Sequence, residues 1–253
     1  MSHLLPLACG LAAGLVAGLL GVGGGLILVP AMVFLLDVPL KRAVGTSLAA
    51  VIAIAAVAVV AEQVAAPENL RWEWAGWLTL GAIPGSFVGA KLVARLPTRQ
   101  LGLALTVVLV LAAVKISGLL PGLDAVRLPL SGPLPHVAAG FVAGIISALF
   151  GIGGGLLAVP LLALFHPEWR FHACRATSLI MIVPTALAGA LFHRKLEQLD
   201  RALAARLVPG ALAGSVAGVV IAQYSPANVL KLLFAIFLLA SAFRLGRRSL
   251  GAS

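Results

Sequence analysis

The feature that most restricts the fold of this chain is a glycine-rich segment that occurs twice. Residues 21–30 read GVGGGLILVP, and residues 151–160, which lie 130 positions later, read GIGGGLLAVP. Other matches at nearly the same spacing are Thr46-Ser47 with Thr177-Ser178, and Gly81, Gly85 and Gly89 with Gly210, Gly214 and Gly218. So many matches indicate an internal duplication. We predict two homologous halves, residues 1–120 and 137–253, with a linker rich in proline and glycine at residues 121–136.

The composition places both halves in a membrane. Hydrophobic residues make up 61% of the chain and charged residues 10%, whereas soluble domains average roughly 45–50% and about 25%. The net charge of +10 comes from 18 lysines and arginines that stand between long apolar runs. We interpret them as signals of membrane topology and not as a nucleic-acid site. Cys9 and Cys174 are far apart and predict two buried, apolar side chains.

Uncharged runs divide the chain into candidate membrane helices. They cover residues 4–36, 43–61, 74–90, 100–114, 128–167, 176–193, 207–230 and 232–243. A single helix over residues 4–36 would be about 50 Å long at about 1.5 Å per residue, but the hydrocarbon core is only about 30 Å thick. This run must therefore tilt strongly, break or turn back, and its glycines predict the break. Each half then contains one glycine-broken helical element followed by three transmembrane helices.

The distribution of positive charge favours halves of opposite orientation. If every apolar run crossed the membrane once, the halves would be parallel and the cations would divide almost evenly between the two faces. If each glycine-broken element is a re-entrant hairpin, the second half is inverted, and one face collects twelve of the eighteen cations. That face would be cytoplasmic and would carry both termini. We predict an all-α polytopic membrane protein of two inverted repeats, with kinked full spans as the alternative.

Paired Gly-x-Gly-Gly-Gly-x-x-x-x-Pro segments, each followed by a Thr-Ser pair, resemble the sulfite exporter TauE/SafE family of anion transporters. The resemblance covers roughly residues 4–245. It implies a bacterial inner-membrane permease for sulfite, for sulfonates such as sulfoacetate, or for related small anions. It does not fix the substrate, because members of this family are assigned different ones.

The glycine segments also predict an anion site on physical grounds. Glycine lets the backbone turn within the membrane and aim N–H groups inward, and the half-helices that follow present N-termini with partial positive charge. In inverted-repeat transporters such ends meet at a substrate site near the midplane. The candidate substrate-binding glycines are Gly23, Gly24, Gly25, Gly153, Gly154 and Gly155. The alternative is that these glycines only allow close helix packing, which is our interpretation of the ladders at residues 10–18, 81–89 and 210–218.

Polar side chains near the glycines complete the candidate site. They are Thr46, Ser47, Thr177, Ser178, Arg175 and Lys115. The hydroxyls either cap the second span of each half or donate to a bound oxyanion. Arg175 and Lys115 either attract the anion or extend to the membrane interface. No motif predicts a metal or a cofactor, and we expect none.

The acidic residues and the missing catalytic motifs limit the mechanism. All eight acids, Glu62 among them, stand at the ends of apolar runs or between them, so we expect no coupling through an intramembrane carboxylate. We predict anion export by alternating access, driven by the membrane potential. An enzyme is disfavoured because the chain has no HExxH motif and no GxSxG elbow. An anion channel and a non-transporting membrane assembly subunit stay open as alternatives. The expected partners are a small anion and the lipid bilayer, and a homo-oligomer also stays open.

Overall fold

The structure is a computed structural model that describes residues 4–92, 98–117, 132–195 and 199–249. These residues form helices joined by short turns, and no strand is present among them. The helices are α1 (Leu4–Leu20), α2 (Gly25–Leu35), α3 (Leu40–Ala65), η1 (Pro67–Asn69), α4 (Trp72–Leu92), α5 (Thr98–Ser117), α6 (Pro133–Phe150), α7 (Gly155–Phe165), α8 (Phe171–Lys195), α9 (Arg201–Tyr224) and α10 (Ala227–Ser249). Much of the predicted linker lies outside the described residues.

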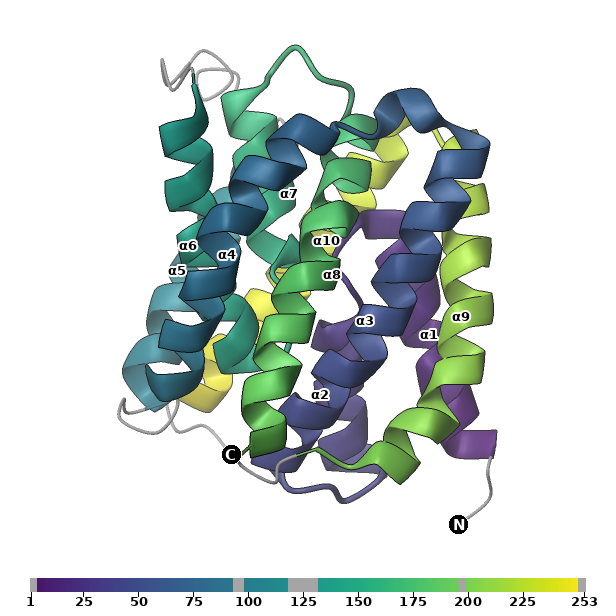
Figure 1. The fold of residues 1–253 in the computed structure, drawn as a ribbon, viewed down its shortest axis with the longest axis vertical. Helices are drawn as coiled ribbons and strands as arrows, with labels where there is room; N and C mark the ends of the chain where they lie inside the picture. The colour runs from purple at the N-terminus through teal and green to yellow at the C-terminus, as the bar shows by residue number, and fades with distance from the viewer. Residues whose placement is uncertain (1–3, 93–97, 118–131, 196–198, 250–253) are drawn as a thin grey trace.

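Two glycine breaks interrupt the helical course of the chain. The first glycine break, residues 21–24, separates α1 from α2, and the second, residues 151–154, separates α6 from α7. Three glycines in each break have φ between 69° and 86°, a left-handed conformation that costs other residues roughly 1–2 kcal/mol. In Figure 1, α2 returns toward the edge at which α1 began, and both chain ends lie at that edge.

The two halves pack against each other in a reciprocal way. The first helix of one half, α1, lies along α9, and the first helix of the other half, α6, lies along α4. Glycines make these contacts close, because a Cβ at Gly14 would collide with the backbone of α9, and a Cβ at Gly85 would collide with that of α6. The prediction that the glycine ladders are helix-packing faces is confirmed.

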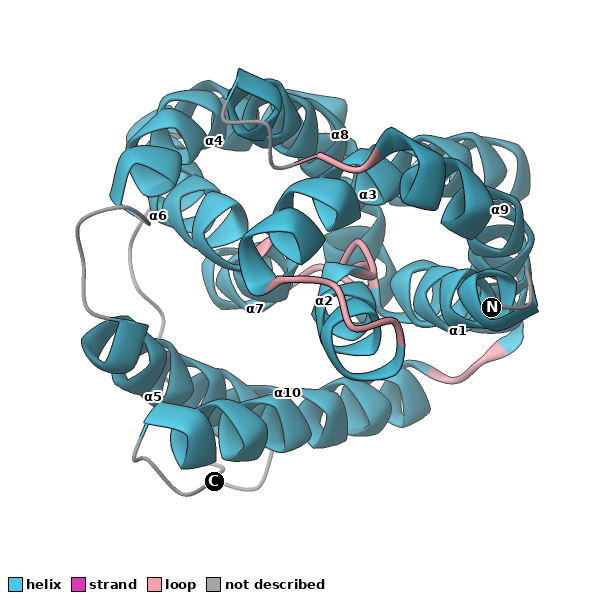
Figure 2. Cartoon of the chain, turned by 90° about the horizontal axis from the view of Figure 1, so that it is seen from below, coloured by secondary structure: helices cyan, strands magenta, loops and turns pink. Residues whose placement is uncertain are grey.

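Helices α3 and α8 pack together in the bundle, and α5 packs with α10. Figure 2 shows the α5–α10 pair along one side, with α2 and α7 in the middle. Four described helical segments are long and apolar enough to cross a membrane, namely Lys41–Ala65, Pro133–Phe150, Phe171–Phe192 and Arg201–Tyr224. Cys9 and Cys174 are buried as predicted. The architecture is that of an all-helical membrane protein.

Candidate functional site

The two glycine breaks and the residues that follow them meet inside the bundle. Residues 21–25 and 151–155 are all buried. A Cβ on Gly25 would collide with the backbone of the second break, and a Cβ on Gly155 would collide with that of the first. The backbones of the two halves therefore touch directly at this point, and only glycine permits so close an approach.

The amides at this junction are largely uncommitted. Among the described residues, no carbonyl or side chain accepts a hydrogen bond from the N–H groups of residues 23–26 or 153–156. These groups begin α2 and α7, where a helix carries partial positive charge. The apolar side chains of Val51 on α3 and Ile182 on α8 lie against Gly23 and Gly153.

The two predicted serines hold the glycine breaks in place. The Ser47 hydroxyl lies 2.9 Å from the carbonyl oxygen of Gly151, and the Ser178 hydroxyl lies 2.6 Å from that of Gly21. Each hydroxyl also lies 2.8 Å from the carbonyl three residues earlier in its own helix. Each serine therefore donates its hydrogen to a backbone carbonyl in this conformation, and in each case one of the two acceptors belongs to the opposite half.

The two predicted threonines join the ends of other helices. The Thr46 hydroxyl oxygen accepts from the amide of Asp200, just before α9, and the Thr177 oxygen accepts from the amide of Arg71, just before α4. The capping alternative was wrong, because α3 begins six residues before Thr46 and α8 begins six before Thr177. A hydroxyl this far inside a helix cannot reach the free amides of the first turn.

Arg175 does not extend to the membrane interface, and that alternative was also wrong. Its side chain is fully buried. One guanidinium nitrogen, Nη1, donates to the carbonyl oxygen of Gly18 at 2.5 Å, and the other, Nη2, donates to Glu62 at 2.7 Å. The stem of Arg175 contacts Gly21. Arg175 is therefore tied to the last turn of α1 and to the first glycine break.

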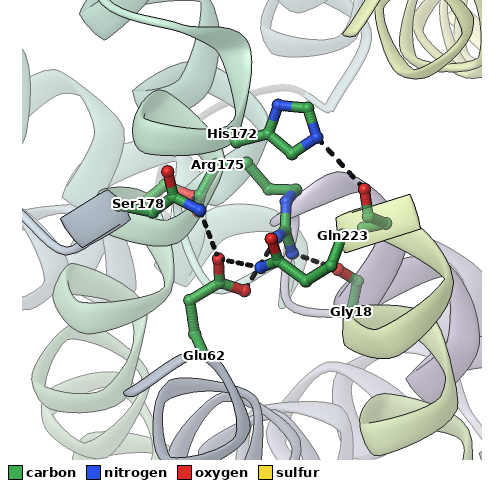
Figure 3. A network of polar contacts seen from close by, with 8 residues as sticks. Gly18, Glu62, His172, Arg175, Ser178 and Gln223 are labelled. Atoms are coloured by element: carbon green, nitrogen blue, oxygen red, sulfur yellow. Dashed lines mark hydrogen bonds and ion pairs between the residues drawn. The ribbon is translucent and has the colours of Figure 1, made fainter. Parts of the chain in front are cut away.

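Glu62 corrects the expectation that no carboxylate is buried. It ends the apolar run at residues 43–61, but α3 continues to Ala65 and carries the side chain into the protein, where it is fully buried. Its Oε2 pairs with Arg175, and its Oε1 accepts from Gln223 at 2.6 Å and from Asn69 at 3.2 Å. Figure 3 shows Glu62, Arg175 and Gln223 pointing toward one another. Sequence reasoning missed Glu62, Asn69 and Gln223 as site residues.

Buried polar atoms without a partner lie near both breaks. Among the described residues, the unpartnered side-chain atoms are Arg175 Nε, His172 Nδ1 and Ser147 Oγ. His172 precedes Arg175 by one turn of α8, and its Nε2 lies 3.1 Å from the carbonyl of Ala222. Because a carbonyl can only accept, that Nε2 carries the hydrogen. Arg175 Nε is a hydrogen-bond donor, so the site contains one donor that no described residue uses.

Of the remaining candidates, the side chain of Lys115 lies outside the described residues. A second polar cluster stands apart from the glycines. There, His136 and His166 are 3.0 Å apart through their Nε2 atoms, and Trp74 and Trp169 pack on their rings. This cluster joins the start of α6, the end of α7 and the start of α4.

Residues 2–118 and residues 136–252 both match the family described as Sulfite exporter TauE/SafE. The chain belongs to this family. The two matched stretches are TauE/SafE units, and each contains one glycine break.

Several TauE/SafE relatives carry similar names. The chain is 28% identical to the probable membrane transporter protein YunE of Bacillus subtilis, over 94% of this chain and 95% of that protein. It is 32% identical to a probable membrane transporter protein of Haemophilus influenzae over 63% of this chain and 62% of that protein. It is 26% identical to the probable membrane transporter protein MJ0441 of Methanocaldococcus jannaschii over 74% and 71%. No solved structure matches the chain.

This TauE/SafE protein also has a cleft of about 770 Å³ bounded by α3, α4 and α8. Its lining is almost entirely apolar and includes Trp77 and Pro184. Trp72 and Leu80 on its rim are 55% and 59% exposed, so the cleft opens on the outer surface of the helices. It offers no cation to an anion, and the buried junction near Arg175 is the better candidate site.

Proposed function

We propose that this protein is a transporter that exports small sulfur-containing anions, either sulfite or an organosulfonate such as sulfoacetate, across the inner membrane of a bacterium. The description of the family names sulfite export, and the relatives that align along most of their length are named probable membrane transporters. The proposal gives the protein no catalytic step. Its substrate-binding groups are Arg175 and the amides of the two glycine breaks.

The observation that carries the proposal is the buried guanidinium beside the first glycine break. A charged side chain within a membrane segment is costly and usually marks a substrate or ion pathway. Arg175 offers a donor, Nε, that no described residue uses. Guanidinium groups also match the oxygen atoms of oxyanions well, because their donors form a planar fork. A sulfite or sulfonate group could therefore bind between this fork and the uncommitted glycine amides.

The reciprocal contacts of the two halves support inverted repeats and alternating access. α1 pairs with α9 as α6 pairs with α4, and Ser47 bonds the second break as Ser178 bonds the first. Two such units related by an axis in the membrane plane can rock against each other around a central site. In this proposal the positively charged face is cytoplasmic and carries both termini. A shift of α3 against α8 would move Val51 and Ile182 away from the glycines.

Counterflow in proteoliposomes tests the proposal. Vesicles loaded with unlabelled sulfite or sulfoacetate should take up the labelled anion transiently and saturably. Arg175→Lys keeps the charge but loses the fork, and we expect its rate to fall by about tenfold or more, since a hydrogen bond to a charged group contributes about 1.5–3 kcal/mol. The matched control is Arg170→Lys, which alters an exposed cation just before α8 and should leave the rate unchanged.

Three outcomes would contradict the proposal. Flux that does not saturate and shows no counterflow would indicate an anion channel. Absence of flux for every sulfur anion would favour a membrane assembly subunit. An undiminished rate in Arg175→Lys would move the substrate site away from α8.

A further inference from the structure

The ion pair at the candidate site already contains an anion. Glu62 places one oxygen on Arg175 and its other oxygen on the side-chain amides of Gln223 and Asn69. These donors come from α8, α9 and η1, so the carboxylate joins three separate elements. A sulfonate or sulfite group presents oxygen atoms to donors in the same way as this carboxylate. Glu62 therefore occupies Nη2, one of the guanidinium donors that a substrate anion would need.

We propose that Glu62 is the proton-binding group of the anion site, and that an anion binds to Arg175 as Glu62 takes up one proton. The proposal rests on the proposed function, because it assumes that Arg175 receives the anion. A protonated Glu62 no longer pairs ionically with Arg175, but it can still accept from Gln223 and Asn69 through its carbonyl oxygen. A singly charged anion would then be carried together with one proton.

The charge of the buried site supports this coupling. Arg175 and Glu62 are both fully buried, and their charges cancel. An anion that entered without a proton would leave one negative charge uncompensated in a site removed from water, which is strongly unfavourable. Uptake of a proton by Glu62 returns the site to neutrality. The same balance explains why a carboxylate lies beside the cation, since a lone buried Arg175 would itself be uncompensated while the site is empty.

Within the described part of the chain, the titratable groups on the elements around Glu62 include the following. α8 contributes His172 besides Arg175, and η1 contributes Glu68, which is exposed. Arg71 follows η1 and is also exposed. α1 and α2 contain no charged residue, and α9 faces Glu62 with the neutral amide of Gln223. Among the described residues named here, His172 is the other buried group that could accept the proton, and the experiment must separate it from Glu62.

Calorimetric titration of the full-length protein in detergent with methanesulfonate tests the proposal. This probe is a monovalent sulfonate that stays ionised near neutral pH, so any proton taken up on binding belongs to the protein. Titrations in two buffers with different ionisation enthalpies give the number of protons taken up. For the wild type we expect one proton per anion. The affinity should fall by about tenfold for each pH unit wherever Glu62 of the anion-free protein is ionised.

Four variants complete the design. Glu62→Gln removes the titrating group but keeps the side-chain shape, and its affinity should no longer depend on pH. Glu62→Asp keeps a carboxylate and should still take up a proton, so it serves if Glu62→Gln does not fold. His172→Gln can keep a donor toward Ala222 and should behave like the wild type, as should the exposed control Glu68→Gln.

The outcomes separate this proposal from the proposed function. Binding by the wild type without proton uptake would overturn the role of Glu62 and leave Arg175 as the anion site. Proton uptake that persists in Glu62→Gln, or that disappears in His172→Gln, would also overturn it. No binding of methanesulfonate or sulfite by the wild type would overturn the anion site itself, and the proton coupling with it.

Discussion

The first and second glycine breaks have the same backbone but different polar surroundings. Both begin with a left-handed glycine, both end in a half-helix that contains a proline, and both accept a serine hydroxyl from the opposite half. Beside the first break, however, Arg175 reaches Gly18 and pairs with Glu62. The residue equivalent to Arg175 beside the second break is Val44, an apolar and buried side chain.

This difference distinguishes the features that build the fold from the features that could bind a substrate. Features that both breaks share, such as the glycine contacts and the serine bonds, are needed to build either half. The ion pair is needed by only one of them. The second break is built with the apolar Val44 at the equivalent position, so the shared architecture does not require such a pair. This asymmetry supports the proposal that the substrate anion binds beside Arg175 and Glu62.

The largest expected effect is on the ion pair. Arg175→Met leaves Glu62 buried without its cation, and breaking a buried pair in this way costs about 3–5 kcal/mol. Val44→Met places the same side chain at the equivalent position and leaves no charge unpaired, so we expect about 1–3 kcal/mol from overpacking alone. Equilibrium unfolding in mixed micelles measures both. Equal losses of unfolding free energy in the two variants would contradict the inference that only the first break depends on a buried ion pair.

A double variant separates the stability of the pair from its function. Arg175→Met combined with Glu62→Met replaces the pair with apolar side chains, which is often neutral for stability. We expect most of the lost stability to return while counterflow stays absent. Recovery of counterflow would show that the pair has no role in transport.

The scaffold could be predicted from the sequence because its signals are local and repeated. A glycine every fourth residue predicts a close helix contact, and the structure places such contacts along α1, α4 and α9. The duplicated glycine segment predicted a break in the helix, and helices end at Leu20 and Phe150 as a result. Each of these inferences needs only the spacing of residues along the chain.

The ion pair could not be predicted in this way. Arg175 and Glu62 are 113 residues apart in the sequence. Each stands near the end of an apolar run. At such a position the sequence pattern does not show whether a charged side chain faces the lipid headgroups or the protein interior. One signal was available. The second half has Arg175 where the first half has Val44. A position at which the two halves differ in this way indicates a role that only one half needs.

The next prediction concerns the glycines that precede the half-helices. Gly24→Ala and Gly154→Ala both force a left-handed residue, at roughly 1–2 kcal/mol each. The new Cβ at residue 24 would lie 2.7 Å from the backbone oxygen of Ala13, whereas at residue 154 it would lie 3.1 Å from the flexible end of Met181. We expect Gly24→Ala to lower the free energy of unfolding more than Gly154→Ala. The opposite order would show that the new Cβ displaces the backbone of α1 at a lower free-energy cost than it displaces the side chain of Met181.

The smallest expected effect tests the part of the junction that is symmetric. Ser47→Ala and Ser178→Ala each remove one hydroxyl that bonds a glycine carbonyl of the opposite half, and each loss should cost about 1 kcal/mol. Both hydroxyls have the same two kinds of acceptor, so the two costs should agree within experimental error in unfolding measurements. A larger loss of stability for Ser178→Ala would mean that this serine also positions Arg175, whose carbonyl it contacts at 2.8 Å. Ser178 would then belong to the proposed substrate site as well as to the contact between the halves.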